Sequence, residues 1–179
     1  GAALKADAYG IGAARAVVEL SRAGCREFFV ALIDEGISLR KVLAEAGLDG
    51  HIHILGGPMA PQAMTRHRLT PVLNSLSDIE TWKNAPPEFA ADIHIDTGMS
   101  RLGLPPEELQ VLANDQAAIK GLNISYVMSH LACAEDRETT MNDEQLQRFK
   151  QALKLFPGCK ASLANSSGIY LGPGYHFDL

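Results

Sequence analysis

The 179-residue sequence lacks long apolar runs, an excess of positive charge and a cysteine framework. No stretch is long and apolar enough to cross a bilayer, so we expect no membrane partner. Acidic residues outnumber basic ones by 21 to 16, and no basic patch stands out, which argues against a nucleic-acid partner. The three cysteines, Cys25, Cys133 and Cys159, are scattered and fit a reducing cytoplasm better than a set of disulfides.

The chain also has no low-complexity stretch, no linker and no short repeat to divide it. Hydrophobic residues make up 46% of the sequence and charged residues 21%, which is ordinary for a globular domain. We therefore interpret residues 1–179 as one domain with a substantial core.

Short apolar runs alternate with amphipathic stretches along this domain. The predicted strands cover 2–5, 28–32, 51–55, 70–73, 91–96, 124–128 and 160–164, and the predicted helices cover 13–23, 34–46, 61–67 and 142–156, with two more beginning near 77 and 105. Ser77 and Glu80 form a candidate capping box at one helix start. This α/β alternation implies a parallel sheet with crossover helices. Seven strands approach the eight of a TIM barrel, which typically needs ~250 residues, and a doubly wound open sheet fits the same pattern.

The most informative stretch begins at Lys5, which ends the first predicted strand and is followed by a turn-prone Asp-Ala-Tyr-Gly segment. We expect the Lys5 side chain to point into a site at the carboxyl end of that strand. A lysine in a dry pocket loses proton affinity, and its amine can then form a Schiff base with a carbonyl. Tyr9 lies four residues on, where a loop would place its hydroxyl near the same site.

Other chemically capable side chains also follow predicted strands. Arg101 follows the fifth strand, His130 ends the sixth, and Asn165 and Ser166 follow the seventh. In a parallel barrel, all strand carboxyl ends open on one face, so these side chains are expected to converge with Lys5 in a single site.

Four motifs resemble those of the alanine racemase family. Lys5–Gly10 resembles its pyridoxal-phosphate lysine motif, and His94–Gly103 resembles its second hallmark. Ser129–Ala132 and Ala164–Gly168 resemble a third and a fourth. The motifs come in the family's order, and the resemblance covers nearly the whole chain. It implies a (β/α)8 TIM-barrel-type domain, here incomplete at both ends with about seven strands.

The resemblance also implies a cofactor, pyridoxal 5'-phosphate, and roles for the residues that bind it. Lys5 would hold the cofactor as a Schiff base and act as one of two proton-transfer bases. The Tyr9 hydroxyl would bind the cofactor phosphate, and Asn165, Ser166 and Ser167 sit where barrels often build a phosphate cradle.

Two further residues would complete the site. Arg101 would contact the cofactor's phenolic oxygen and the substrate carboxylate, for which a charged planar fork is suited. His130 would pack beside the cofactor in a hydrogen-bond network. Many members of the family carry a carbamylated lysine seven residues before this arginine, and here that position is His94. A histidine cannot form the carbamate, but it could hold Arg101 by a hydrogen bond, directly or through water.

The activity implied is interconversion of L- and D-alanine in a cytoplasmic homodimer, which would supply D-alanine for peptidoglycan. In the family, the second base is a tyrosine from the β-domain of a partner subunit. No segment of this sequence matches that domain, so the 179-residue chain alone is expected to have little or no racemase activity.

Two other functions remain open from the residues. A related pyridoxal-phosphate barrel protein would be a basic-amino-acid racemase, a decarboxylase or a carrier without turnover. A metal-dependent hydrolase would use His51 and His53 on one strand face, with His94, His130 and Asp96 as further ligands. In the amidohydrolase barrels, however, the paired histidines come on the first strand, before the lysine.

Overall fold

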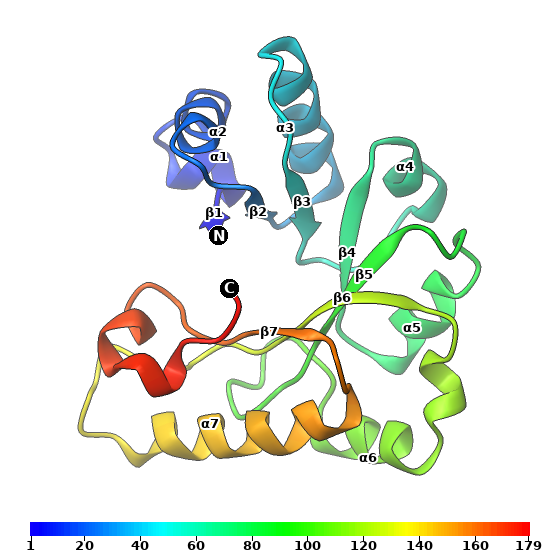
Figure 1. Ribbon diagram of the computed structural model, residues 1–179, viewed down its shortest axis with the longest axis vertical. Helices are drawn as coiled ribbons and strands as arrows, with labels where there is room; N and C mark the ends of the chain where they lie inside the picture. Colours follow the sequence, from blue (N-terminus) through cyan, green and yellow to red (C-terminus); the bar gives the residue numbers. More distant parts are fainter. The chain divides into compact units, whose positions relative to one another are not determined.

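The computed structural model describes all 179 residues, and the chain forms two compact units (Figure 1). The first unit comprises residues 1–72 and 84–89, and the second comprises residues 73–83 and 90–179. Both consist of short parallel strands alternating with helices, as the sequence predicts. None of the helices combines the length and the apolar character that spanning a membrane requires.

The first unit pairs its strands in chain order, β1 with β2, β2 with β3 and β3 with β4, all parallel. Helix α2 packs against α3, and α3 packs on β2 and β3. The last residue of β4 belongs to the second unit. The elements are β1 Ala2–Ala3, α1 Lys5–Tyr9, α2 Ala13–Arg22, β2 Glu27–Val30, α3 Ile33–Glu45, β3 His51–Ile54, α4 Pro61–Arg66 and β4 Leu69–Leu73.

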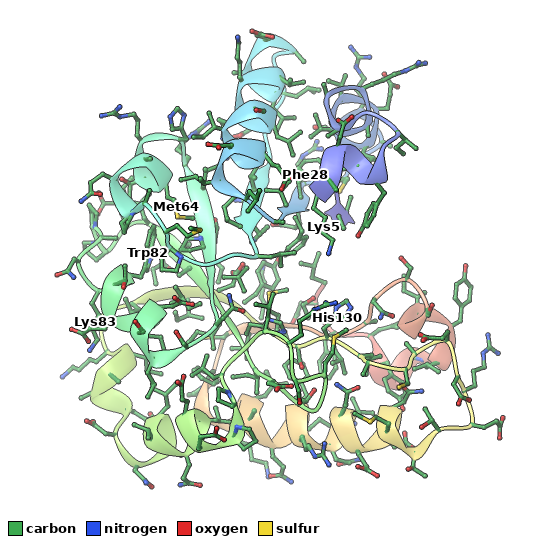
Figure 2. The ribbon with its side chains drawn as sticks, turned by 180° about the vertical axis from the view of Figure 1, so that it is seen from behind. Lys5, Phe28, Met64, Trp82, Lys83 and His130 are labelled. Carbon is green, nitrogen blue, oxygen red and sulfur yellow. The ribbon has the colours of Figure 1, made fainter.

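The core of the first unit is formed by β-branched and aromatic residues of β2 and β3, of which Phe28 and Ile52 are fully buried and directly opposite each other. Gly36 lets α3 approach these strands closely, because a Cβ there would lie 2.6 Å from Cδ1 of Ile54. Burial on both strand faces is typical of parallel sheets covered by crossover helices. Figure 2 labels Phe28 of β2 and Met64 of α4, which are both fully buried.

The second unit pairs β5 with β6 and β6 with β7, again parallel and in chain order. Its elements are α5 Leu76–Trp82, β5 Ala90–His94, α6 Pro106–Asn114, η1 Gln116–Ile119, β6 Asn123–Met128, α7 Thr140–Ala152, η2 Leu153–Leu155, β7 Lys160–Ser162, η3 Gly168–Leu171 and η4 Pro173–Tyr175. A register shift between Ala91 and Ile93 interrupts the pairing of β5 with β6. There the Asp92 side chain accepts a hydrogen bond from the backbone N–H of Tyr126, at 3.2 Å.

Helix α7 presents an apolar face in the second unit and lies below β6 and β7 in Figure 1. Leu146, Phe149 and Ala152 are buried on this face, at helical spacing. Phe149 meets Phe177 edge to face, with ring centroids 5.2 Å apart. Such aromatic pairs add stability beyond their buried area.

Helix α5 begins earlier than the sequence predicted, and the proposed capping box of Ser77 and Glu80 is wrong. Ser75 is the N-cap residue, and its hydroxyl accepts a hydrogen bond from the backbone N–H of Asp78 at 3.1 Å. The Asp78 carboxylate accepts one from the backbone N–H of Asn74 at 2.8 Å. The two hydrogen bonds satisfy two backbone N–H groups at the start of the helix. Because the helix begins at Leu76, Ser77 lies inside it.

Candidate functional site

The sequence predicted that Lys5 ends the first strand. Instead, Lys5 is the first residue of the short element α1, which follows β1 (Figure 2). Ala6, Asp7, Ala8 and Tyr9 all have φ between 50° and 56°, so this element is a left-handed turn. Left-handed conformations cost roughly 1–2 kcal/mol per residue for amino acids other than glycine. Four in succession persist only where the surroundings fix them, and such strain is concentrated at functional sites.

Specific hydrogen bonds fix the left-handed turn. The Leu4 N–H donates to the Phe29 carbonyl of β2 at 2.7 Å, and the Asp7 carboxylate accepts from the Ala13 N–H at 2.7 Å. As a result, the Lys5 Nζ lies 6.0 Å from the centroid of the Tyr9 ring, which is itself 66% exposed. The turn therefore brings together the Lys5 amine and the Tyr9 ring, two groups that the sequence predicted to share a site.

Arg101 lies in a loop that leaves β5 and returns onto it. Asp96 orders this loop, because its Oδ1 accepts hydrogen bonds from the backbone N–H groups of Gly98 (2.9 Å) and Ser100 (3.0 Å). Gly103 closes the loop with φ at 99°, where a Cβ would lie 2.8 Å from the Asp96 nitrogen. The Arg101 side chain is exposed at this strand end, so its guanidinium can meet a ligand.

His94, the last residue of β5, is nearly buried, with 8% of its surface exposed. Its Nδ1 lies 3.1 Å from the Asn74 side-chain oxygen, a partner that the sequence did not predict. Burial lowers the His94 pKa to about 4, aided by the positive charges of His130 and Arg101 and opposed by Asp96. The imidazole is therefore neutral at physiological pH.

A buried amide joins the Arg101 loop to the segment containing His130. The Gln145 Nε2 donates to Thr97 Oγ1 (3.0 Å) and to the His130 carbonyl (2.9 Å), while its Oε1 accepts from the Ala132 N–H (2.8 Å). The hydroxyls of Thr97 and Ser129 are 2.8 Å apart in the same network. Gln145 was not predicted from the sequence, although its position on the apolar face of α7, four residues before Phe149, indicates a buried polar side chain.

We predict that Gln145→Leu destabilises this unit by about 2–4 kcal/mol, because it leaves buried carbonyl, hydroxyl and N–H groups without partners. The free energy of unfolding in urea would measure the loss. Gln151→Leu, at an exposed position on the same helix, is the matched control and should change stability by less than about 0.5 kcal/mol. Equal stabilities of the two variants would show that the network contributes nothing.

Asn165 and Ser166 follow β7, which ends at Ser162, two residues earlier than predicted. The Asn165 side chain donates to the Leu131 carbonyl at 3.3 Å and accepts from the Gly168 N–H at 2.9 Å, so it joins this loop to the segment after β6. Ser166 is exposed. The Asn165 hydrogen bonds hold the backbone of this loop, and the Ser166 hydroxyl is exposed on it. A loop of this kind is suited to binding an anion such as phosphate.

The predicted site residues thus form two groups. Lys5 and Tyr9 belong to the first unit, whereas Arg101, His130, Asn165 and Ser166 belong to the second. Each residue follows the carboxyl end of a parallel strand, and Figure 2 labels Lys5 and His130 at those positions. The chemistry available is an amine, a phenol, a guanidinium, an imidazole and a loop of small donors.

The histidines proposed as metal ligands are placed differently. His53 is buried, with its Nε2 2.8 Å from Glu27 Oε2 and its ring stacked on Phe29 at 4.4 Å. His51 is exposed. Side chains of histidine, cysteine, aspartate and glutamate form no group of three or more suited to one ion. The geometry therefore gives no support to the metal-dependent hydrolase.

The whole chain is similar to known proteins. The family model "Alanine racemase, N-terminal domain" matches residues 1–179. An alanine racemase from Rickettsia africae is 46% identical over 187 residues, covering 100% of this chain and 51% of that protein. A catabolic alanine racemase from Mesorhizobium japonicum is 43% identical over 182 residues, covering 98% of this chain and 47% of that protein.

Among solved structures, the chain is similar to alanine racemase from Bartonella henselae with covalently bound pyridoxal phosphate. The TM-score is 0.91 at 43% sequence identity, covering 100% of this chain and 53% of that one. This similarity confirms the predicted α/β fold class with seven parallel strands of the barrel type. The chain spans about half the length of the curated relatives it matches.

Proposed function

Because the chain belongs to the family of alanine racemase N-terminal domains, we propose that it supplies the pyridoxal-phosphate-binding part of an alanine racemase. The observation that carries the proposal is Lys5, held at a strand end by a left-handed turn. The similar Bartonella henselae enzyme has covalently bound pyridoxal phosphate, which supports the choice of cofactor.

The residues present fit this cofactor. Lys5 offers the amine for covalent attachment, and Tyr9, from the same turn, offers a hydroxyl to the phosphate. We also propose that Asn165 and Ser166 bind the phosphate, since Asn165 braces a loop on which Ser166 is exposed. When bound, pyridoxal phosphate supplies the aldehyde that the lysine amine attacks and an electron-withdrawing ring that acidifies the substrate's α-hydrogen.

We propose alanine as the substrate, with its carboxylate bound by Arg101. The planar guanidinium fork matches the planar carboxylate. His94 stays neutral, so it adds no second positive charge beside the guanidinium. His130 would pack beside the cofactor on a backbone that Gln145 holds in place. These residues orient the substrate so that its α-hydrogen faces a base.

Racemisation also requires a base on each face of the substrate. We propose that the Lys5 amine takes or returns the α-proton on one face, as a positioned general base. The proposed second base is a residue outside these 179 residues, contributed by a partner subunit in a homodimer. We further propose a cytoplasmic location, in accord with the scattered cysteines, which are all unpaired.

The test is an assay of alanine racemisation with added pyridoxal phosphate. The full-length product of the gene that encodes this chain is expected to interconvert L- and D-alanine, and the 179-residue chain alone to show little or no turnover. Turnover by the chain alone near that of the full-length product would contradict the assignment of the second base. A full-length product that binds the cofactor without turnover would contradict the racemase and favour a carrier.

A further inference from the structure

Glu35, the third residue of helix α3, accepts hydrogen bonds from three backbone N–H groups. Its Oε1 lies 2.6 Å from the Ala6 nitrogen, and its Oε2 lies 2.8 Å from the Ala31 nitrogen and 2.9 Å from the Leu32 nitrogen. All three donors lie in the first unit, at the carboxyl ends of β1 and β2. Hydrogen bonds to an ionised carboxylate are about twice as strong as neutral ones.

Helix capping accounts for only part of this arrangement. A glutamate at the third position commonly accepts from the N-cap residue, which here is Leu32. The bond from Ala6 joins residues 29 positions apart and has no role in starting the helix. Glu35 is therefore placed to serve the turn that contains Lys5 as well as its own helix.

The two residues that flank Lys5 each donate their backbone N–H to the segment from β2 to α3. The Leu4 N–H, on one side, donates to the Phe29 carbonyl at 2.7 Å. The Ala6 N–H, on the other side, donates to Glu35. Ala6 is also the first residue of the left-handed run, with φ at 50°. The Glu35 carboxylate thus holds the backbone at the point where the strained turn begins.

We propose that Glu35 is a positioning residue that fixes the direction in which the Lys5 amine is presented to pyridoxal phosphate. This inference rests on the proposed function and assigns a role that neither helix capping nor the fold demands. Glutamine is the informative substitution, since it has one acceptor oxygen and one donor amide. In either orientation its NH2 group faces a backbone N–H, so the bond to Ala6 or the bonds to Ala31 and Leu32 are lost.

The experiment follows capture of added pyridoxal phosphate by the full-length gene product, with borohydride quenching at set times and peptide mapping of Lys5. Glu35→Gln is expected to slow formation of the Lys5 adduct by about 10- to 100-fold, because small misplacements of a reacting group cost that much. Glu45→Gln is the matched control: it makes the same change on the same helix at an exposed position and should capture at the wild-type rate.

A second control separates positioning from loss of stability. Arg40 donates to the carbonyls of Gly50, His67 and Arg68 in the first unit, at bonds of 2.7–3.1 Å, and makes none to the Lys5 turn. Arg40→Gln is expected to lower the unfolding temperature without slowing capture. If Arg40→Gln slowed capture as much as Glu35→Gln, Glu35 would have only a structural role and the inference would be overturned.

The remaining outcomes are distinguishable. If the wild-type protein forms no adduct at Lys5, the proposed function fails; if it does and Glu35→Gln matches its rate, this inference alone fails. Should Glu35→Gln not fold, hydrogen exchange of the wild-type protein tests the same contact. The Ala6 amide is expected to be protected at least about 100-fold over an unstructured peptide, and exchange at the unprotected rate would overturn the inference.

Discussion

Substitution of Lys5 by alanine is expected to abolish covalent capture of pyridoxal phosphate and to lower kcat/KM for alanine racemisation at least ~1000-fold. The substitution removes both the attaching amine and the base on one face of the substrate, and positioned bases alone contribute typically ~100- to 10,000-fold. The fold should survive, because Lys5 is partly exposed and the turn is held by backbone groups and by Asp7.

The control for this substitution is Lys41→Ala, which removes an exposed lysine from α3 in the same unit. It should leave capture and racemisation unchanged. A small primary amine added to the Lys5→Ala variant should restore part of the turnover, since it replaces the missing base. Undiminished racemisation by Lys5→Ala would contradict the role of this lysine.

The second large effect concerns stability at low pH and arises from His94. Its folded-state pKa is about 4, against 6.5 for an ordinary histidine, and the main cause is burial. Between these values the unfolded chain binds a proton that the folded chain does not bind. Stability is therefore complete above pH 6.5 and falls as the pH drops toward 4, by up to about 3 kcal/mol from this one group.

Comparison with His94→Gln isolates this contribution, because glutamine keeps a donor for Asn74 and does not titrate. The free energy of unfolding in urea should be measured for both proteins at pH 7.5 and at pH 4.5. The wild type is expected to lose about 2–3 kcal/mol more than the variant, since the other titrating groups largely cancel. Parallel losses, or an NMR titration of His94 near pH 6.5, would contradict a neutral buried imidazole.

The sequence predicted those features that depend on local pattern. Short apolar runs that alternate with amphipathic stretches marked the seven strands, and the apolar spacing of Leu146 and Phe149 marked α7. Where two local patterns competed, prediction failed: Ser75 and Ser77 each precede an acidic residue by three positions, and only the folded chain selects Ser75.

The left-handed turn after Lys5 lay beyond local prediction. Alanine, aspartate and tyrosine rarely adopt positive φ, so a reading from propensity extends the strand to Lys5 instead. The conformation depends on bonds from outside the turn, including that from Ala6 to Glu35, 29 residues away. The contact of Gln145 with Thr97 joins residues 48 positions apart, so local sequence patterns could not predict it either. The candidate site residues were proposed from the sequence, whereas the groups that hold their loops in place required the structure.

The central claim is that Lys5 is the residue that binds pyridoxal phosphate. The most direct measurement is incubation of the full-length gene product with pyridoxal phosphate, borohydride reduction and peptide mapping by mass spectrometry. A single stable adduct on Lys5 is the predicted result. An adduct on another lysine, such as Lys41 or Lys83, with Lys5 unmodified, would contradict the account.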